Sequence, residues 1–352
     1  MLNPTDDVRI KSLRPLLPPA ILMEELPAHP EVCRVVAEGR RQVAEILRGK
    51  DDRALVVVGP CSIHHPEAGL EYARRLRGVA DQYQKDLCIV MRVYFEKPRT
   101  IVGWKGLIND PHLDDSYAIN EGLRTARRFL LNVVQFGLPA GTEFLDPITP
   151  QFIADLVSWG AIGARTVESQ VHRELASGLS MPVGFKNGTG GTIQIAIDAV
   201  RSSAQPHHFL SVTKQGLAAI VATAGNPECH VILRGGSKGP NYSSDHVAQV
   251  IEKLEAAHVP VKLMIDCSHA NSGKKYERQP EVLADVARQI SAGNNAIFGL
   301  MLESFLRDGR QDHEKGKELA FGQSITDACM GWERTEPLFE TLSLAVRKRR
   351  EH

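Results

Sequence analysis

The sequence lacks long apolar runs and any excess of charge of one sign. No stretch of its 352 residues reaches the ~20 consecutive apolar residues of a membrane-spanning helix, and the N-terminus has no apolar signal region. Forty-two Lys and Arg balance 42 Asp and Glu, so no global field attracts nucleic acid or an anionic membrane. We therefore expect neither partner, and any cationic site must be local.

Cysteines are few and are not arranged in pairs. The six cysteines form no CxxC motif and no regular framework, which indicates reduced thiols and a cytoplasmic protein. Apolar residues make up 43% of the chain, enough for a substantial core. A chain of this length is compatible with two domains or with one large α/β barrel.

One sequence pattern recurs from residue 55 onwards. A short β-branched run is followed by a break with Gly, Pro or charge and then by a helical stretch. Eight such runs with helical connections predict α/β architecture, a (β/α)8 TIM barrel that occupies residues 51–352. The eight runs are 55–59, 87–93, 140–145, 161–165, 183–186, 230–234, 263–266 and 296–302.

Three segments fall outside this repeat. Residues 1–50 predict an N-terminal extension, which is either a cap on the barrel floor or a regulatory or subunit-contact element. Residues 208–213 and 217–223 flank a short turn and predict an inserted β-hairpin. Residues 336–350 have helical periodicity and end in four cations, as suits a helix C-terminus.

Ionisable residues stand at the end of every predicted strand. The βα loops of a barrel build its catalytic face, so these positions are expected to meet there. Four of them are cations from different strands, and cations that converge need an anion between them. Singly, each cation is more commonly part of a structural ion pair. Together they predict a site for a small polyanion, better with two phosphoryl or carboxylate groups than with one. The eight residues are Cys61, Arg92, Glu143, Arg165, Lys186, Arg234, His269 and Glu303.

The loop after the second run is the most cationic part of this face. It carries Lys97, Arg99 and Lys105 interleaved with packing side chains such as Trp104, without helical periodicity. This pattern favours a loop that faces phosphate. The alternative is a packed loop whose Lys and Arg lay their apolar stems along the surface.

The remaining strand ends offer a set of metal ligands. A thiolate, an imidazole and two carboxylates suit Mn, Fe, Co or Zn and suit Mg poorly. His64 and His65 compete as ligands, but they begin the following helix. Taken alone, a cysteine of this kind is more often a small buried apolar residue. The four candidate ligands are Cys61, His269, Glu303 and Asp327.

Six segments contain most of the candidate site residues: Gly59-Pro60-Cys61-Ser62-Ile63-His64, Met91 to Thr100, Gly163-Ala164-Arg165, Gly184-Phe185-Lys186-Asn187-Gly188, Leu233-Arg234-Gly235-Gly236 and Ser324-Ile325-Thr326-Asp327. Together they resemble the type I 3-deoxy-D-arabino-heptulosonate 7-phosphate (DAHP) synthases. The resemblance spans roughly residues 6–350, and its most specific parts are the Lys-Pro-Arg-Thr and Gly-Pro-Cys-Ser segments. The sequence departs from the family pattern at His65, Val167 and Gly190, none of which is a proposed ligand or phosphate contact.

The resemblance implies a metal-dependent barrel that condenses phosphoenolpyruvate with erythrose 4-phosphate, the first step towards the aromatic amino acids. It implies one divalent ion (Mn, Fe, Co or Zn) on Cys61, His269, Glu303 and Asp327. The residues implied for phosphoenolpyruvate are Arg92, Lys97, Arg165, Lys186 and Arg234, with Glu143 nearby. Those implied for erythrose 4-phosphate are Lys97, Pro98, Arg99 and Thr100.

Within that reaction we expect Lys97 to transfer a proton to the nascent alkoxide. Arg92 and Arg99 are expected to lower its pKa towards neutrality. His269 or a water on the metal is the alternative donor, and Cys61 belongs to the catalytic set as a ligand.

The resemblance also implies feedback inhibition by an aromatic amino acid, Phe before Tyr, and a homodimer or homotetramer. Two aspartates could meet the effector's ammonium group, and apolar side chains could line its pocket. The alternative is that these positions are ordinary interface and core residues. The implied positions are Asp6, Asp7, Pro150, Gln151, Leu175, Leu179, Ser180, Phe209, Ser211 and Val221.

Three other functions were weighed. A metal-dependent aldolase and the sister synthase that uses arabinose 5-phosphate are the nearest enzymes, and the Lys-Pro-Arg-Thr loop argues against the sister synthase. A phosphosugar-binding regulatory barrel without catalysis would need a ligand or phosphate contact to be missing, and all are present.

Overall fold

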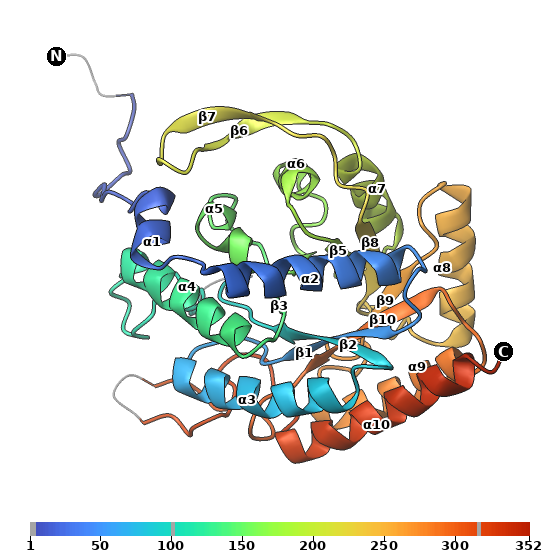
Figure 1. The fold of residues 1–352 in the computed structure, drawn as a ribbon. Coiled ribbons are helices and arrows are strands. Elements are labelled where there is room, and N and C mark those ends of the chain that lie inside the picture. Colours follow the sequence, from blue (N-terminus) through green and yellow to red (C-terminus); the bar gives the residue numbers. More distant parts are fainter. Residues whose placement is uncertain (1–4, 100–102, 315–317) are drawn as a thin grey trace.

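The computed structural model describes residues 5–99, 103–314 and 318–352. Within these residues, eight parallel strands close into a barrel in the order β1-β10-β9-β8-β5-β4-β3-β2, with helices around it (Figure 1). The predicted (β/α)8 barrel is therefore confirmed. Its strands are β1 (Ala54–Gly59), β2 (Leu87–Arg92), β3 (Ala140–Glu143), β4 (Trp159–Ile162), β5 (Val183–Lys186), β8 (Cys229–Leu233), β9 (Leu263–Asp266) and β10 (Ile297–Glu303).

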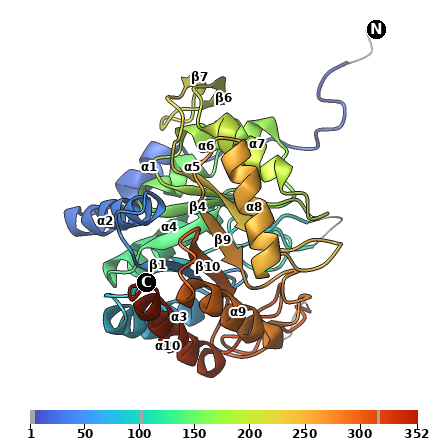
Figure 2. The same ribbon diagram turned by 90° about the vertical axis from the view of Figure 1, so that its right-hand side faces the viewer.

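Amphipathic helices cover the outside of the barrel (Figure 2). The longer ones are α2 (Pro30–Leu47), α3 (Pro66–Gln82), α4 (Ile119–Gln135), α6 (Gln170–Gly178), α7 (Gln194–Ser203), α8 (Ser244–Ala256), α9 (Gln279–Ser291) and α10 (Trp332–Arg349). The short ones are α1 (Pro19–Glu25), α5 (Pro150–Ile153), η1 (Ala154–Leu156) and η2 (Tyr276–Arg278).

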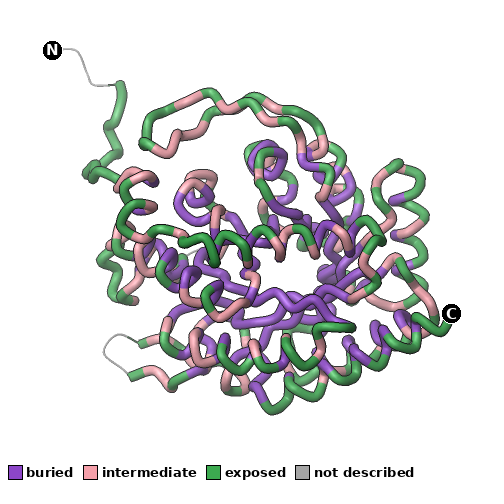
Figure 3. Tube along the Cα trace, in the orientation of Figure 1, coloured by how far each residue is buried: buried purple, intermediate pink, exposed green. Residues whose placement is uncertain are grey.

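Every residue of the eight barrel strands is buried, as Figure 3 shows in the middle of the molecule. Parallel strands are covered on both faces, by helices outside and by packed side chains inside, which is why they appear in sequence as nearly continuous apolar runs. Because the strands are apolar and buried, a charged residue at the end of a strand is easy to recognise in the sequence.

Several predicted strand ends differ from the observed ones by one or two residues, and one differs by three. The run predicted over residues 161–165 forms β4, which begins at Trp159 and ends at Ile162. Gly163 ends the strand because its carbonyl accepts hydrogen bonds from the N–H groups of Thr166 and Val167 and so closes a turn. Arg165 therefore lies in a turn beyond the strand.

The predicted hairpin is present as β6 (His208–Val212) and β7 (Ala218–Ala222), which pair antiparallel and lie outside the barrel over α5 and α6 (Figure 1). Its two faces differ. On one face, Phe209 and Val221 are partners in register and are partly buried. On the other face, Leu210 and Ile220 are 85% and 77% exposed.

The segment before β1 holds α1 and α2, and its first described residues extend away from the body of the molecule (Figure 1). The residues just before α1 lie against the barrel, where Arg14 and Leu17 hydrogen-bond to Tyr117 and Asn120. Arg40 of α2 donates hydrogen bonds to the carbonyls of Ala154 and Val157, which holds α2 against the barrel. The C-terminal helix begins four residues earlier than predicted. Among the described helices, none combines the length and the apolar character needed to cross a membrane.

Candidate active site

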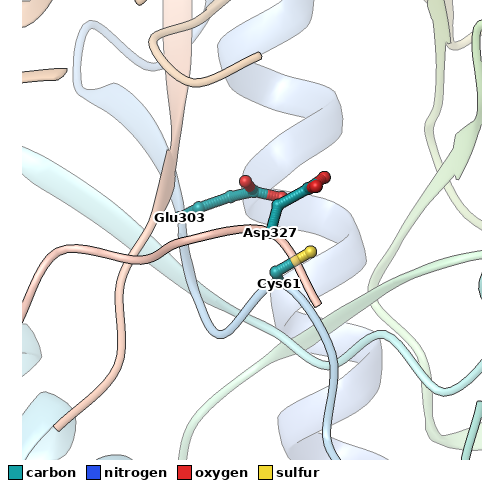
Figure 4. Close-up of side chains that lie close together, drawn as sticks. All are labelled: Cys61, Glu303 and Asp327. Carbon is teal, nitrogen blue, oxygen red and sulfur yellow. The ribbon is translucent and has the colours of Figure 1, made fainter. Parts of the chain in front are cut away.

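Three side chains, one from a strand end and two from loops, meet at the C-terminal end of the barrel. The ligand atoms of Cys61, Glu303 and Asp327 all lie within 4.8 Å of one another (Figure 4). Cys61 follows β1, Glu303 ends the neighbouring strand β10, and Gly59 of β1 is in register with Glu303. This pairing brings the thiol beside the carboxylate, and the loop after β10 returns with Asp327.

The electrostatics of this group call for a cation. Burial raises the pKa of the Cys61 thiol, and the charge of Glu303 raises it further. Burial also opposes ionisation of Asp327, but the charges of Lys97 and His269 outweigh it and lower the pKa of that carboxyl group. A buried thiol between two carboxylates is unfavourable unless a positive charge lies among them.

His269 lies at the edge of this group. Its Nε2 is 3.8 Å from Glu303 Oε1, and its Nδ1 is 2.9 Å from Asp266 Oδ2. His269 is not among the three residues whose ligand atoms mutually lie within 4.8 Å, although it lines a small cavity of about 290 Å³ together with Asp327. The imidazole thus faces the cluster through Glu303.

Arg92 lies at the centre of the barrel mouth and is 1% exposed. Its guanidinium donates to Glu303 Oε1 at 2.8 Å and to the carbonyl oxygen of Pro60 at 3.1 Å. The guanidinium carbon lies 3.6 Å from the centroid of the Tyr94 ring, close enough for a cation–π interaction. Arg92 is therefore held rigidly beside the carboxylate cluster.

Lys97 reaches the same group, since its Nζ donates to the carbonyl oxygen of Cys61 at 2.7 Å. Burial by itself would lower the pKa of Lys97, and Arg92 acts in the same direction. Negative charge at Cys61 and Glu303 outweighs both, so this pKa lies above its ordinary value. The prediction that neighbouring arginines lower it towards neutrality is therefore wrong.

A first cation-lined cavity, of about 790 Å³, contains Arg165, Arg234 and Lys274 in its wall. Arg234 is 8% exposed, and within the described part of the chain its guanidinium donates one protein hydrogen bond, to the carbonyl oxygen of Gly235 at 3.4 Å. Burial lowers the pKa of Arg234, and the charge of Arg165 contributes to the same shift. Two neighbouring cations with so few partners are suited to an anion.

A second cavity, also about 790 Å³, is lined by Lys97, Pro98, Arg99 and Lys105. Arg165 lines this cavity as well as the first, so the two adjoin at its side chain. Thr100, the fourth residue predicted for erythrose 4-phosphate, lies outside the described residues. The arrangement offers two anion sites that share one arginine.

Two further residues shape this mouth. Glu143 ends β3 and is 7% exposed, and it fits because residue 163 is glycine: a Cβ there would lie 2.1 Å from Glu143 Oε1. Lys186 ends β5, is buried, and has its Nζ 3.0 Å from Asp266 Oδ2.

Glu96 holds the cationic loop after β2 in place through hydrogen bonds to a neighbouring segment. Its buried carboxyl group accepts hydrogen bonds from the N–H groups of Leu145 and Asp146 and from the Thr149 hydroxyl. Burial raises the pKa of Glu96 to about 8, the charge of Asp146 adds to the rise, and these three hydrogen bonds oppose it. The contacts tie the loop after β2 to the segment that enters α5.

Comparison with known proteins decides the family. The family model described as "DAHP synthetase I family" matches residues 28–340. The chain belongs to this family. It is 60% identical over 345 residues to the Phe-sensitive phospho-2-dehydro-3-deoxyheptonate aldolase of Escherichia coli (strain K12), which covers 98% of each chain. It is 53% identical to the tyrosine-inhibited aldolase of Schizosaccharomyces pombe (strain 972 / ATCC 24843), over 99% of this chain and 94% of the relative.

A solved structure agrees. The phospho-2-dehydro-3-deoxyheptonate aldolase of Francisella tularensis SCHU S4 superposes with a TM-score of 0.94 at 54% identity, over 97% of this chain and 99% of that one. The predicted family and enzyme class, DAHP synthase, are confirmed. The names of the two relatives describe one as Phe-sensitive and the other as tyrosine-inhibited.

The donor atoms fit the metal that DAHP synthases are expected to carry. One thiol and two carboxylates, with an imidazole at their edge, suit a divalent ion of intermediate softness. Burial, and after it the charge of Glu303, raise the pKa of Cys61, and a bound cation would oppose both effects.

One residue of this DAHP synthase mouth was missed from sequence. Asp266 is the last residue of β9 and lies against both Lys186 and His269. The rule that strand ends carry the chemistry would have found it. Sequence analysis assigned that position to His269, three residues further on.

A third cavity, of about 350 Å³, lies between the hairpin and the segment 150–180. It also contains the charged side chains of Arg40, Asp155 and Lys214. Asp6 and Asp7 do not line it; both are exposed in the extended N-terminal segment. Eight of the ten positions expected for an effector line this cavity: Pro150, Gln151, Leu175, Leu179, Ser180, Phe209, Ser211 and Val221.

Proposed function

We propose that this DAHP synthase condenses phosphoenolpyruvate with erythrose 4-phosphate and water and releases inorganic phosphate. The observation that carries the proposal is the meeting of two cation-lined cavities at Arg165, beside the Cys61–Glu303–Asp327 group. Each substrate brings one phosphate, so a site for both needs two anion pockets with a reactive centre between them.

Phosphoenolpyruvate is assigned to the first cavity. Arg165 and Arg234 line this cavity and supply cations that have few protein partners. Lys186, Arg92 and Glu143 do not line it, and the proposal brings them to the substrate as the last residues of β5, β2 and β3. Fixed cations of this kind hold the phosphate and carboxylate groups, orient C3 of phosphoenolpyruvate and displace water.

Erythrose 4-phosphate is assigned to the second cavity, with its phosphate at Arg99 and Thr100 and its aldehyde towards Lys97. The raised pKa keeps Lys97 protonated at neutral pH, which is the form that can give a proton to the aldehyde oxygen as it becomes a hydroxyl group. The hydrogen bond from Nζ to the carbonyl oxygen of Cys61 holds the ammonium group at the reactive centre.

Cys61, Glu303 and Asp327, with His269 beside them, are the residues that would hold one Mn, Fe, Co or Zn ion. Such an ion supplies Lewis-acid polarisation of a carbonyl group. The bonds balance as follows. C3 of phosphoenolpyruvate bonds to the aldehyde carbon with the electron pair of the C2–C3 double bond, the aldehyde oxygen takes a proton, and water adds to C2 and loses a proton. Phosphate then leaves with the electron pair of its bond to C2, while the new C2 hydroxyl group loses its proton and becomes the ketone.

Phosphate release from phosphoenolpyruvate, erythrose 4-phosphate and Mn²⁺ tests this function. We expect one phosphate per DAHP formed, no release without either substrate, loss of activity with a chelator and recovery with Mn²⁺ or Co²⁺. Cys61→Ala should not recover with any divalent ion. Release with arabinose 5-phosphate but not with erythrose 4-phosphate would contradict the assignment and favour the sister synthase.

We propose further that the 350 Å³ cavity binds an aromatic amino acid, Phe in preference to Tyr. Leu175, Leu179, Phe209 and Val221 give it an apolar wall of the size of a phenyl ring. In a single chain Asp6 and Asp7 lie elsewhere, so their predicted contact with the ammonium group needs a second copy of the chain to bring them to the cavity.

Calorimetric titration of Phe, Tyr and Trp into wild type and Ser180→Phe tests the effector. We expect the strongest binding for Phe and none in the variant, whose larger side chain fills the cavity. Heat of binding for none of the three amino acids would remove the regulatory proposal and leave the catalytic one standing.

A homodimer or homotetramer is the proposed assembly, in a cytoplasmic protein. Leu210, Leu217 and Ile220 of the hairpin and Leu13 of the N-terminal segment are largely exposed apolar side chains, as expected where a second copy packs. Light scattering should give a multiple of 38.7 kDa. Leu210→Glu combined with Ile220→Glu should shift it towards the monomer, and a monomeric wild type would contradict the proposal.

A further inference from the structure

Asp266 is a fully buried carboxylate that collects four polar groups at the end of β9. Its Oδ1 accepts from the Ser268 N–H at 3.0 Å and from the Ser268 hydroxyl at 2.5 Å. Its Oδ2 lies 3.0 Å from Lys186 Nζ and 2.9 Å from His269 Nδ1. Asp266 is not one of the three clustered candidate ligands, so we look for its role in the side chains that it contacts, Lys186 and His269.

The hydrogen positions around the His269 ring follow from these contacts. The Ser268 hydroxyl hydrogen is committed to Asp266 Oδ1, so the lone pairs of Ser268 Oγ face His269 Nδ1 at 2.7 Å. Nδ1 therefore faces the Ser268 Oγ acceptor and carries the ring hydrogen. Asp266 Oδ2 adds its charge 2.9 Å away, without the geometry of a hydrogen bond. In the neutral ring the free lone pair is then on Nε2, the atom on the Glu303 side.

The backbone supports the same orientation. His269 has a φ of +54°, in the left-handed region that non-glycine residues rarely adopt. Such a conformation persists when its surroundings hold it. Here Asn271 donates to the carbonyl oxygens of Asp266 and Leu233, and the Ala270 N–H donates to the carbonyl oxygen of Arg234. The turn after β9 is thus fastened to β8 and returns the imidazole to the strand end.

We propose that Asp266 is a positioning residue that fixes the His269 ring with Nε2 towards the metal and, through the same carboxylate oxygen, holds Lys186 at the phosphoenolpyruvate pocket. This inference rests on the proposed function, in which Lys186 meets the substrate. Because Oδ2 is shared, an anion that engages Lys186 leaves Oδ2 freer to hold His269. Phosphoenolpyruvate and the metal should therefore tighten each other's binding, by the same factor in both directions.

Asp266→Asn tests the first part, with Mn²⁺ alone as the probe. The amide keeps the shape of the carboxylate but loses its charge. One of its two polar atoms becomes an N–H donor, which cannot accept from the donors that surround Asp266. We expect the Mn²⁺ dissociation constant from calorimetry to rise ten- to a hundredfold, the usual effect of losing a carboxylate behind a histidine ligand. In the metal-free protein, ¹⁵N NMR should show His269 protonated on Nδ1 in wild type and a mixture of tautomers in the variant.

The second part is read from Mn²⁺ affinity with and without phosphoenolpyruvate. Wild type should bind Mn²⁺ more tightly with the substrate present, and Asp266→Asn should lose most of that gain. Asp86→Asn is the matched control, because Asp86 is also buried and paired with cations, at Arg347 and Arg350 away from the barrel mouth. It should lower stability and leave both Mn²⁺ measurements unchanged.

Ser268→Ala keeps the inference testable if Asp266→Asn does not fold, since it removes the hydrogen-bond acceptor at Nδ1 and leaves the charge of Asp266 beside the ring. We expect a severalfold weaker Mn²⁺ affinity and the same tautomer mixture. A folded variant at either position with wild-type Mn²⁺ affinity and wild-type His269 tautomer would overturn the inference. A wild type that binds Mn²⁺ as expected but releases no phosphate would instead refute the proposed function alone.

Discussion

At the scale of single residues, charge from distant strands decides how each group behaves. Lys97 is the clearest case, because negative charge at Cys61 and Glu303 overrides burial and the nearby Arg92 and raises the pKa of Lys97. Sequence reasoning saw the arginines that are near in the chain and not the anions that are near in space. The residue was identified correctly as part of the mouth, but the direction of its pKa shift needed the fold.

Lys97→Met should lower kcat by ~10²–10⁴-fold, the usual contribution of a positioned acid or base. The Mn²⁺ dissociation constant should change little, because the Lys97 ammonium contacts the carbonyl oxygen of Cys61 and is not a ligand. Lys253→Met, at an exposed position of α8 outside these cavities, is the control and should retain the turnover. Near-normal kcat in the Lys97 variant would exclude it as the proton donor.

His230 predicts a loss of stability in acid. Burial lowers the pKa of this histidine to about 3, against an ordinary value of 6.5. As pH falls below 6.5 the unfolded chain binds a proton that the folded ring excludes, so the free energy of unfolding decreases with falling pH. The stability lost on this account between pH 7 and pH 5 is about 2 kcal/mol.

His230→Gln tests this, because glutamine keeps an acceptor for the Trp159 indole N–H but does not titrate. Urea denaturation at pH 7 and pH 5 should show a smaller difference in the variant than in wild type. His352→Gln, at an exposed position, should leave the difference as it is. An identical pH dependence in wild type and His230→Gln would contradict the assignment.

At the scale of elements, strand ends and loops do different work. The strand ends were predictable, because apolar β-branched runs mark parallel strands and the residues just beyond them face the same side. The bounds of β4 could not be predicted, because the chain turns at Gly163 and a five-residue run does not show where a turn begins. Which loops touch each other depends on tertiary packing, and the Glu96 contacts could not be predicted.

Glu96→Ala should loosen the loop that carries Lys97 and Arg99. The change removes three hydrogen bonds to the segment 145–149. Losing such buried bonds costs ~1–3 kcal/mol, so we expect the KM for erythrose 4-phosphate to rise about tenfold or more. The Mn²⁺ affinity should be unchanged. Glu71→Ala, on the outer face of α3, should leave KM as it is, and an unchanged KM in Glu96→Ala would refute the role of this contact.

At the scale of the whole molecule, one closed barrel brings together residues from positions 61 to 327. The catalytic cavities lie at the strand ends, and the 350 Å³ cavity lies under the hairpin on the outside. Glu96 contacts the segment that enters α5, and Pro150 and Gln151 of α5 line the outer cavity. The sequence could assign both regions through resemblance, but only the fold shows that they share this segment.

The central claim is that the end of β10 and two loops of this DAHP synthase bring Glu303, Cys61 and Asp327 to a single metal. The most direct test is X-ray diffraction from crystals soaked in Mn²⁺, with data collected near the manganese absorption edge. We predict one anomalous peak per chain, in contact with the Cys61 sulfur and with the carboxylates of Glu303 and Asp327. A peak elsewhere in the barrel, or none at these side chains at saturating Mn²⁺, would contradict the account.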